Sequence, residues 1–212
     1  MQTRDILLEA GLRVFSRHGY RRASMSMVAE EAGLTRQAVY HHFASKEQLF
    51  SALVDMLNVR AHAAAATAVD AGPRQPMADR LVQALVAHQA AILQGVAGSL
   101  HEDELMAEGM KRCGGAVELH ARRFERLLAS IVRDAVASGE VVPVSGSSER
   151  QFISLLLAAA KGIKVTHLQA GAKAHAQALG LMVRVLCRGA FAIPSQSHSI
   201  QMTGHSARRA RT

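Results

Sequence analysis

The segment 33–50 constrains this chain more than any other part of its sequence. An alanine-rich, acidic stretch at 28–32 runs into Gly33, and glycine ends helices readily because it adopts positive φ without a Cβ clash. Two residues later, Thr35 can cap a new helix by accepting a hydrogen bond from a backbone N–H. Two short helices joined by a tight glycine-containing turn form a helix-turn-helix, whose second helix enters the DNA major groove. We therefore predict a helix-turn-helix at about 24–43.

The composition indicates a helical globular protein. The 212 residues are 49% hydrophobic, 20% charged and only 4% aromatic, which favours helices over sheets. The chain has no run of about 18 or more apolar residues and no secretory signal, so we expect no membrane span and a cytoplasmic location. Cys113 and Cys187 are then expected to be free thiols. The net charge of +8 is compatible with phosphate contacts, but the basic residues are too evenly spread to indicate them alone.

Apolar spacing along the chain predicts an all-α fold of about nine helices with no strand. The clearest break is the glycine- and proline-containing segment 71–76. We expect an N-terminal helix-turn-helix DNA-binding domain at 1–61, a C-terminal helical domain at 62–193 and a disordered basic tail at 194–212. The helices are expected at about 3–18, 25–32, 36–43, 45–69, 77–94, 102–113, 116–138, 149–169 and 173–191.

The N-terminal quarter of the chain resembles the tetracycline-repressor (TetR) family of bacterial regulators. The matching segments are 15–20 at the end of the first predicted helix, 28–35, and most strongly 38–43 followed by 45–49. The resemblance implies an all-helical homodimer that binds a palindromic operator in double-stranded DNA and is released by a small ligand. It also implies that the C-terminal domain binds that ligand and forms the dimer.

The resemblance places the DNA contacts on and around the helix at 36–43, which we call the reader helix. Arg36 and Gln37 lie in its first turn, where arginine can pair with guanine and glutamine with adenine. The small side chain of Ala38 can touch a thymine methyl group, and nearby hydroxyls and cations can contact phosphates. Adjacent histidines on a helix point about 100° apart, so we expect no metal site there. The expected DNA-binding residues are Ser24, Ser26, Thr35, Arg36, Gln37, Ala38, Tyr40, His41, His42 and Lys46.

The predicted helix at 149–169 is apolar around nearly its whole circumference, and a helix apolar all round must be buried on more than one side. The predicted helix at 173–191 carries an apolar stripe, so the two together are too apolar to lie alone in water. Packing on the same subunit on one side and on a second copy on the other gives a four-helix bundle around a two-fold axis. The alternative is that these residues form the internal core of a monomer. The expected dimer interface is Phe152, Leu156, Ala159, Ile163, Ala178, Leu181, Met182 and Val185.

The helices between the reader helix and the last pair are expected to enclose a pocket for an unknown small-molecule effector. Several methionines lie on these helices, and methionine gives adaptable apolar walls. The effector is therefore expected to be largely apolar. The expected lining includes His88, Met106, Met110, His120 and Phe124.

Other functional classes find little support in the sequence. No nucleophile–base motif, phosphate-binding loop or metalloprotease motif is present, so we expect no enzyme, no cofactor and no catalytic residue. An activator of the same fold remains an alternative, as does a non-specific architectural or membrane-surface helical protein. The interpretation that accounts for most features is a ligand-responsive repressor that binds its operator as a homodimer.

Overall fold

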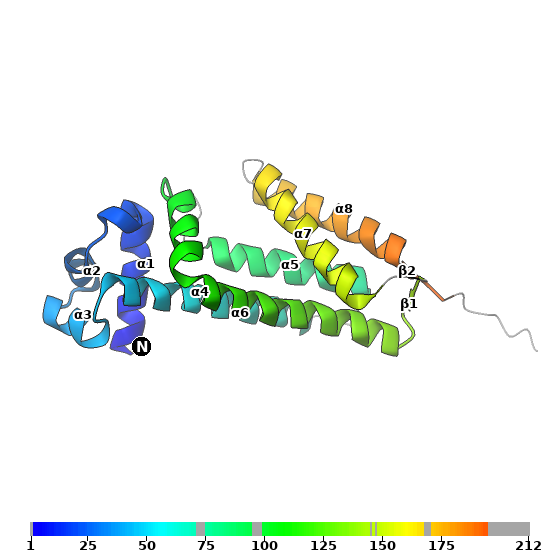
Figure 1. Ribbon diagram of the computed structural model, residues 1–212, viewed down its shortest axis with the longest axis horizontal. Coiled ribbons are helices and arrows are strands. Elements are labelled where there is room, and N and C mark those ends of the chain that lie inside the picture. The colour runs from blue at the N-terminus through cyan, green and yellow to red at the C-terminus, as the bar shows by residue number, and fades with distance from the viewer. Residues whose placement is uncertain are drawn as a thin grey trace, which may run out of the picture.

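The computed structural model describes residues 2–70, 75–94, 99–144, 146, 148–167 and 171–194. Within these ranges the chain forms eight helices and one pair of short strands, in the elongated arrangement of Figure 1. None of the described helices is long and apolar enough to cross a membrane. The elements are α1 (Thr3–Arg22), α2 (Met25–Ala32), α3 (Arg36–His42), α4 (Lys46–Asp70), α5 (Met77–Leu93), α6 (Glu102–Ala137), β1 (Val142–Pro143), α7 (Glu149–His167), α8 (Ala172–Ala190) and β2 (Phe191–Ala192).

The predicted all-α fold is confirmed, with two corrections. The helices expected at 102–113 and 116–138 are one helix, α6, which bends at Cys113, where φ is −122° and ψ is 17°. The two glycines that follow suggested a break, because each weakens a helix interior by about 1 kcal/mol. The apolar face of α6 nevertheless stays packed on both sides of the bend, so the helix continues. The second correction is that β1 and β2 pair antiparallel, where the sequence predicted no strand.

The structure has two hydrophobic cores, which lie toward opposite ends of the molecule. The first, which we call the head core, is built from α1, α2, α3, the first half of α4 and the first part of α6. The second, the body core, is built from the end of α4, α5, α6, α7, α8 and β2. Helix α4 belongs to both, since Leu49, Phe50 and Leu53 lie in the head core and Ala65 in the body core. The expected domain boundary at 61/62 therefore falls inside a continuous helix.

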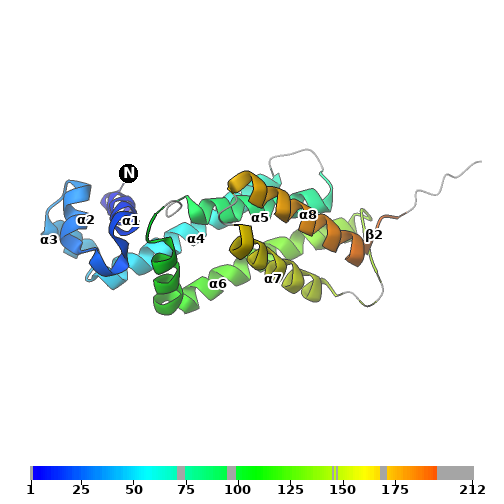
Figure 2. The ribbon, with the colours of Figure 1, turned by 90° about the horizontal axis from the view of Figure 1, so that it is seen from above.

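In the part of the molecule that contains the body core, α7 and α8 lie side by side and pack on α5 and α6. Helix α8 packs on α5 and α7 packs on α6, and the two views in Figures 1 and 2 agree on this arrangement. Residues 195–212, most of the predicted tail, and 168–169, the end of a predicted helix, lie outside the described residues.

Gly19 turns the chain near the end of α1. Its φ is 73° and its ψ is 168°, a combination open almost only to glycine. A Cβ at this position would also overlap the carboxylate of Glu104, which accepts a hydrogen bond from the backbone N–H of Arg21 at 3.0 Å. The bend at Gly19 thus brings the end of α1 against the start of α6.

Replacing Gly19 by alanine should lower the free energy of unfolding by about 2–4 kcal/mol, through backbone strain and the displaced Glu104 contact. Gly33→Ala is the matched control, because Gly33 also has a positive φ (66°) but a Cβ there would meet nothing within 4 Å. That variant should lose only about 1 kcal/mol. Urea denaturation followed by circular dichroism measures both, and equal losses would show that the Glu104 contact contributes nothing.

Candidate DNA-binding site and internal cavity

Backbone capping shapes the helix-turn-helix. The Ser24 side chain accepts a hydrogen bond from Met27 N at 3.3 Å and starts α2, which ends at Gly33 in the left-handed conformation (φ 66°, ψ 30°). The Thr35 side chain accepts from Ala38 N at 3.2 Å and starts α3. Gly33 and Thr35 were predicted from the sequence to end and to start a helix, and both do so.

The reader helix α3 has one buried and one exposed face. Val39 and, just after the helix, Phe43 are buried in the head core and fix how α3 sits on α2. Arg36, Gln37 and Tyr40 are exposed on the outer side, at the end of the molecule farthest from α7 and α8 in Figure 1. Polar and cationic side chains on an exposed helix are free to meet base edges or phosphates.

The remaining predicted DNA contacts are near this face, with different exposures. His41, Ser24 and Thr35 are exposed, whereas Ser26, Ala38 and His42 are half-buried. The rings of His41 and His42 meet edge-on, with centroids 5.3 Å apart. Among the residues that the structure describes, no three His, Cys, Asp or Glu side chains are placed to hold a metal ion.

Lys46, a predicted phosphate contact, also makes contacts within the chain that the sequence did not predict. Its ammonium donates to the backbone carbonyls of Tyr20 at 2.9 Å, Arg21 at 3.3 Å and Ala23 at 3.0 Å. It also lies 4.6 Å from the centre of the Tyr20 ring. An ammonium has three N–H donors, so these carbonyls use all of them and a phosphate would have to displace one. The sequence missed this because the end of α1 meets Lys46 only in the folded chain.

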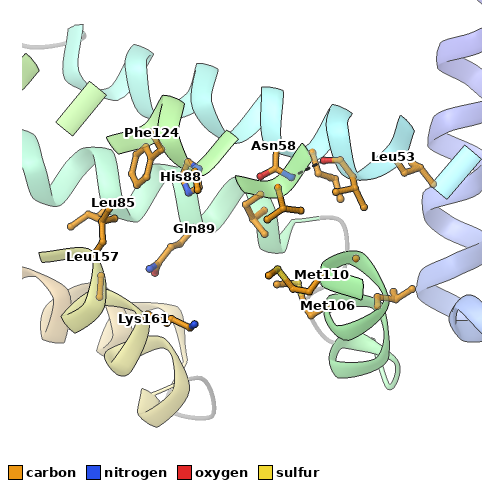
Figure 3. Close-up of a pocket in the computed structure, with 18 of the residues that line it drawn as sticks. Leu53, Asn58, Leu85, His88, Gln89, Met106, Met110, Phe124, Leu157 and Lys161 are labelled. Atoms are coloured by element: carbon orange, nitrogen blue, oxygen red, sulfur yellow. Dashed lines mark hydrogen bonds between the residues drawn. The ribbon is translucent and has the colours of Figure 1, made fainter. Parts of the chain in front are cut away.

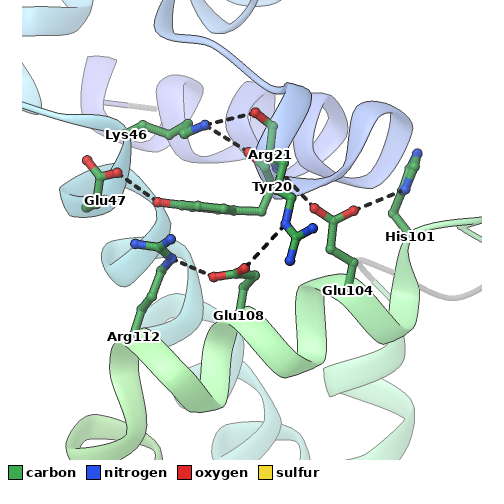
Figure 4. A network of polar contacts seen from close by, with 8 residues as sticks. All are labelled: Tyr20, Arg21, Lys46, Glu47, His101, Glu104, Glu108 and Arg112. Carbon is green, nitrogen blue, oxygen red and sulfur yellow. Dashed lines mark hydrogen bonds and ion pairs between the residues drawn. The ribbon is translucent and has the colours of Figure 1, made fainter.

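A polar network joins the head to the start of α6, as Figure 4 shows. The Tyr20 hydroxyl donates to Glu47 at 2.9 Å, and burial together with this carboxylate raises the pKa of Tyr20 to about 12. Arg112 lies 4.3 Å from the centre of the Tyr20 ring and donates to Glu108 at 2.7 Å. The Arg112 hydrogen bond lowers the pKa of Glu108 and so keeps this carboxylate charged, although its side chain is buried. Arg21 completes the link, with its side chain 3.8 Å from Glu108.

A cavity of about 370 Å³, partly open to solvent beside Met106 and Met110, lies between the head core and the body core. Figure 3 shows its walls, which come from α4, α5, α6 and α7, with α1 closing the side next to the head. His88, Met106, Met110 and Phe124 line it as predicted, and the His88 ring stacks on Phe124 with centroids 3.9 Å apart. The lining is mostly aliphatic and aromatic, which suits an apolar ligand.

The cavity also differs from the prediction. His120 does not line it, because its ring is buried against α4 with Nε2 2.7 Å from Asp55. The sequence did not predict that three polar residues from three different helices would line the same cavity. These residues are Asn58, Gln89 and Lys161. Helical spacing gives the face of each helix but not which faces turn toward a shared space, so the sequence held no signal that joins them.

The expected dimer residues divide into two groups. Phe152 and Leu156 are buried in the body core of their own chain, which corrects their assignment to an interface with a second copy. Leu181 and Val185 on α8 are 63% and 60% exposed, and Leu155 on α7, which was not predicted, is 57% exposed. The others are half-buried at the edge of this apolar face: Ala159, Ile163, Ala178 and Met182.

Lys46→Met should lower the free energy of unfolding by about 1–3 kcal/mol, because three carbonyls lose a charged donor while the apolar stem is kept. Lys173→Met, at an exposed position on α8, is the control and should change stability by less than about 0.5 kcal/mol. Thermal denaturation of the two variants measures the difference. If Lys46→Met is as stable as the parent, the capping role of Lys46 is wrong.

Comparison with known proteins supports the same interpretation of the head. Residues 7–53 match the family described as bacterial regulatory proteins, tetR family. The transcriptional regulator UidR of Escherichia coli strain K12 is 29% identical over 150 residues, covering 66% of this chain and 70% of that protein. The repressor AcnR of Corynebacterium efficiens is 42% identical over 53 residues, covering 25% of this chain and 28% of that protein.

Solved structures share the fold over nearly the whole chain. A transcriptional regulator from Rhodococcus sp. Rha1 has a TM-score of 0.65 at 17% identity and covers 91% of this chain and 100% of its own. The TetR-family regulator PfmR from Thermus thermophilus has a TM-score of 0.59 at 18% identity, covering 86% and 97%. Residues 7–53 are a DNA-binding domain of the TetR family of bacterial regulators, and the chain, like its relatives, is a DNA-binding transcriptional regulator rather than an enzyme.

Proposed function

We propose that this protein is a ligand-responsive repressor that binds a palindromic operator as a homodimer in the cytoplasm. The observation that carries the proposal is the exposed polar face of α3, held at the tip of the molecule by a buried Val39. Residues 1–61 would read DNA, and 62–193 would form the dimer and hold a small, largely apolar effector. The related protein AcnR carries the name of a repressor, which favours repression over activation.

Sequence reading is assigned to the first turn of α3. Arg36 and Gln37 are both exposed there, and a helix that enters the major groove presents its N-terminal residues to the base edges. Arginine pairs in bidentate fashion with guanine and glutamine with adenine. Tyr40 and His41, one turn farther on, would contact the backbone. The hydroxyl oxygens of Ser24 and Thr35 each accept a hydrogen bond from a backbone N–H, so their O–H groups can still donate a hydrogen bond to a phosphate.

The dimer is assigned to the exposed face of α7 and α8. Leu155, Leu181 and Val185 are each more than half exposed, and isolated chains rarely leave such a group of large aliphatic side chains in water. The helices lie side by side, so a second copy related by a two-fold axis would bury the face in a four-helix bundle. A dimer supplies two reader helices for the two halves of a palindrome.

Release by an effector is assigned to the cavity. Phe15 and Leu53 line it from the head core, while Leu85 and Leu157 line it from the body. A ligand that contacts both parts binds one relative arrangement of head and body better than another, and that difference in affinity shifts the equilibrium between them. The operator would then be bound only by the arrangement that the effector disfavours.

Arg36→Ala and Gln37→Ala should each weaken binding to the preferred operator by about 1–3 kcal/mol and relax selectivity at one base position. Arg150→Ala, an exposed arginine on α7 far from α3, controls for loss of charge and should bind as the parent does. Selection of binding sites from a random DNA library, followed by titration, measures both effects. If neither reader variant changes the selected sequence, α3 does not read DNA.

Leu181→Glu should convert the dimer to a monomer, because two symmetry-related carboxylates would be buried without partners. Operator affinity should then collapse although α3 is unchanged. Leu119→Glu is the matched control, since Leu119 is 58% exposed on α6 and lies outside the proposed interface. Analytical ultracentrifugation gives the mass and circular dichroism checks folding. A folded Leu181→Glu variant that remains dimeric would refute this interface.

A further inference from the structure

We propose that the cavity takes an amphipathic carboxylic acid of medium chain length. Its carboxylate would bind Gln89 and Lys161, and its apolar body would extend toward α1 and the start of α6. This inference rests on the proposed role of the cavity as the effector site and adds the chemical class of the ligand. It follows from the way the polar groups are distributed around the lining.

One part of the cavity offers a ligand only apolar contacts. The lining residues from α1, from α4 up to Leu57 and from α6 up to Val117 carry no charge and no polar side-chain atom apart from the thioethers of Met106 and Met110. Leu12 and Phe15 close this part against the head core. A ligand group buried there must therefore be hydrocarbon or aromatic, because a buried polar group without a partner is unfavourable.

The opposite part offers hydrogen-bond donors. In Figure 3, Gln89 and Lys161 lie on the side of the cavity away from Met106 and Met110. The Gln89 side-chain oxygen is hydrogen-bonded to Nε2 of His175, so the amide offers a ligand its N–H groups. Lys161 extends from α7 and adds an ammonium. Two donors, one of them charged, match the two oxygens of a carboxylate.

Two further polar lining residues, Asn58 and Glu125, suit that role less well. Asn58 donates one amide N–H to Val54 O at 2.8 Å and keeps a second N–H and an oxygen, but it carries no charge and so adds no charge-assisted contact to a carboxylate. Glu125 is exposed and carries the same charge as a carboxylate ligand, so it would repel one. Among the lining residues that the structure describes, Lys161 carries the only fixed positive charge. An anionic group would therefore be held at the Lys161 side.

The volume sets the length of the ligand. A space of about 370 Å³ corresponds to about a dozen water-sized groups. A straight-chain acid of about ten carbons has this number of non-hydrogen atoms and separates its carboxylate from its apolar end. Decanoate is therefore a suitable probe, and decan-1-ol has the same chain without the charge.

The test uses the fluorescence of N-phenyl-1-naphthylamine, a neutral apolar dye, on the full-length protein at pH 7.5. Decanoate and decan-1-ol should both displace the dye. Lys161→Met should weaken displacement by decanoate about tenfold and leave decan-1-ol within about twofold, since only the charged contact is lost. Gln89→Leu should weaken displacement of the dye by decanoate several-fold. The control Lys173→Met should not change displacement by either ligand.

The outcomes separate this inference from the proposed effector site. If the dye binds and only decan-1-ol displaces it, or if Lys161→Met leaves decanoate unchanged, the carboxylic-acid class is wrong while the apolar cavity stands. If the dye does not bind, the cavity does not take apolar ligands and both proposals fail. Circular dichroism of each variant ensures that lost binding does not reflect unfolding.

Discussion

Helix α4 is the element on which the rest of the structure depends, because one rigid helix is shared by two hydrophobic cores. Its first half buries Leu49, Phe50 and Leu53 in the head core, and Ala65 near its other end lies in the body core. A helix of 25 residues is about 37 Å long and bends little without proline. The direction of the reader helix is therefore tied to the body that would form the dimer.

A second link runs through the bent helix α6. Its first part reaches the head through Glu104 and Glu108, which contact the end of α1, while the part beyond Cys113 belongs to the body. The cavity lies between this link and α4, so its walls contain side chains from both cores. A molecule that fills it touches both connections between head and body. That placement is the physical basis for proposing control of DNA binding by a ligand.

The features predicted correctly from the sequence are those set by neighbours in the chain. Ser24, Gly33 and Thr35 cap or end helices through hydrogen bonds to residues three or four positions away, and such spacing is visible in a sequence. The periodicity of apolar residues gave the all-α fold for the same reason. The break predicted between 113 and 116 was wrong. The two glycines there weaken the helix locally, but packing of α6 on both sides of the bend outweighs that weakness.

The features missed are those that join distant segments. Lys46 sits at the start of a helix beside the reader, which suggested a phosphate contact, but its three acceptors are carbonyls more than twenty residues away. Phe152 and Leu156 lie on a helix that is apolar nearly all round, so the sequence could not say which side faces its own core. The position of His120 against Asp55 is likewise a product of how α4 and α6 pack.

The central claim is that two reader helices, held apart by a C-terminal dimer, enter successive major grooves of one operator. Hydroxyl-radical footprinting on a site selected from random DNA tests it most directly. Two protected patches related by a two-fold axis, with centres about 34–36 Å apart along one face of the duplex, are the predicted result. A single protected half-site, or uniform protection without sequence preference, would contradict it.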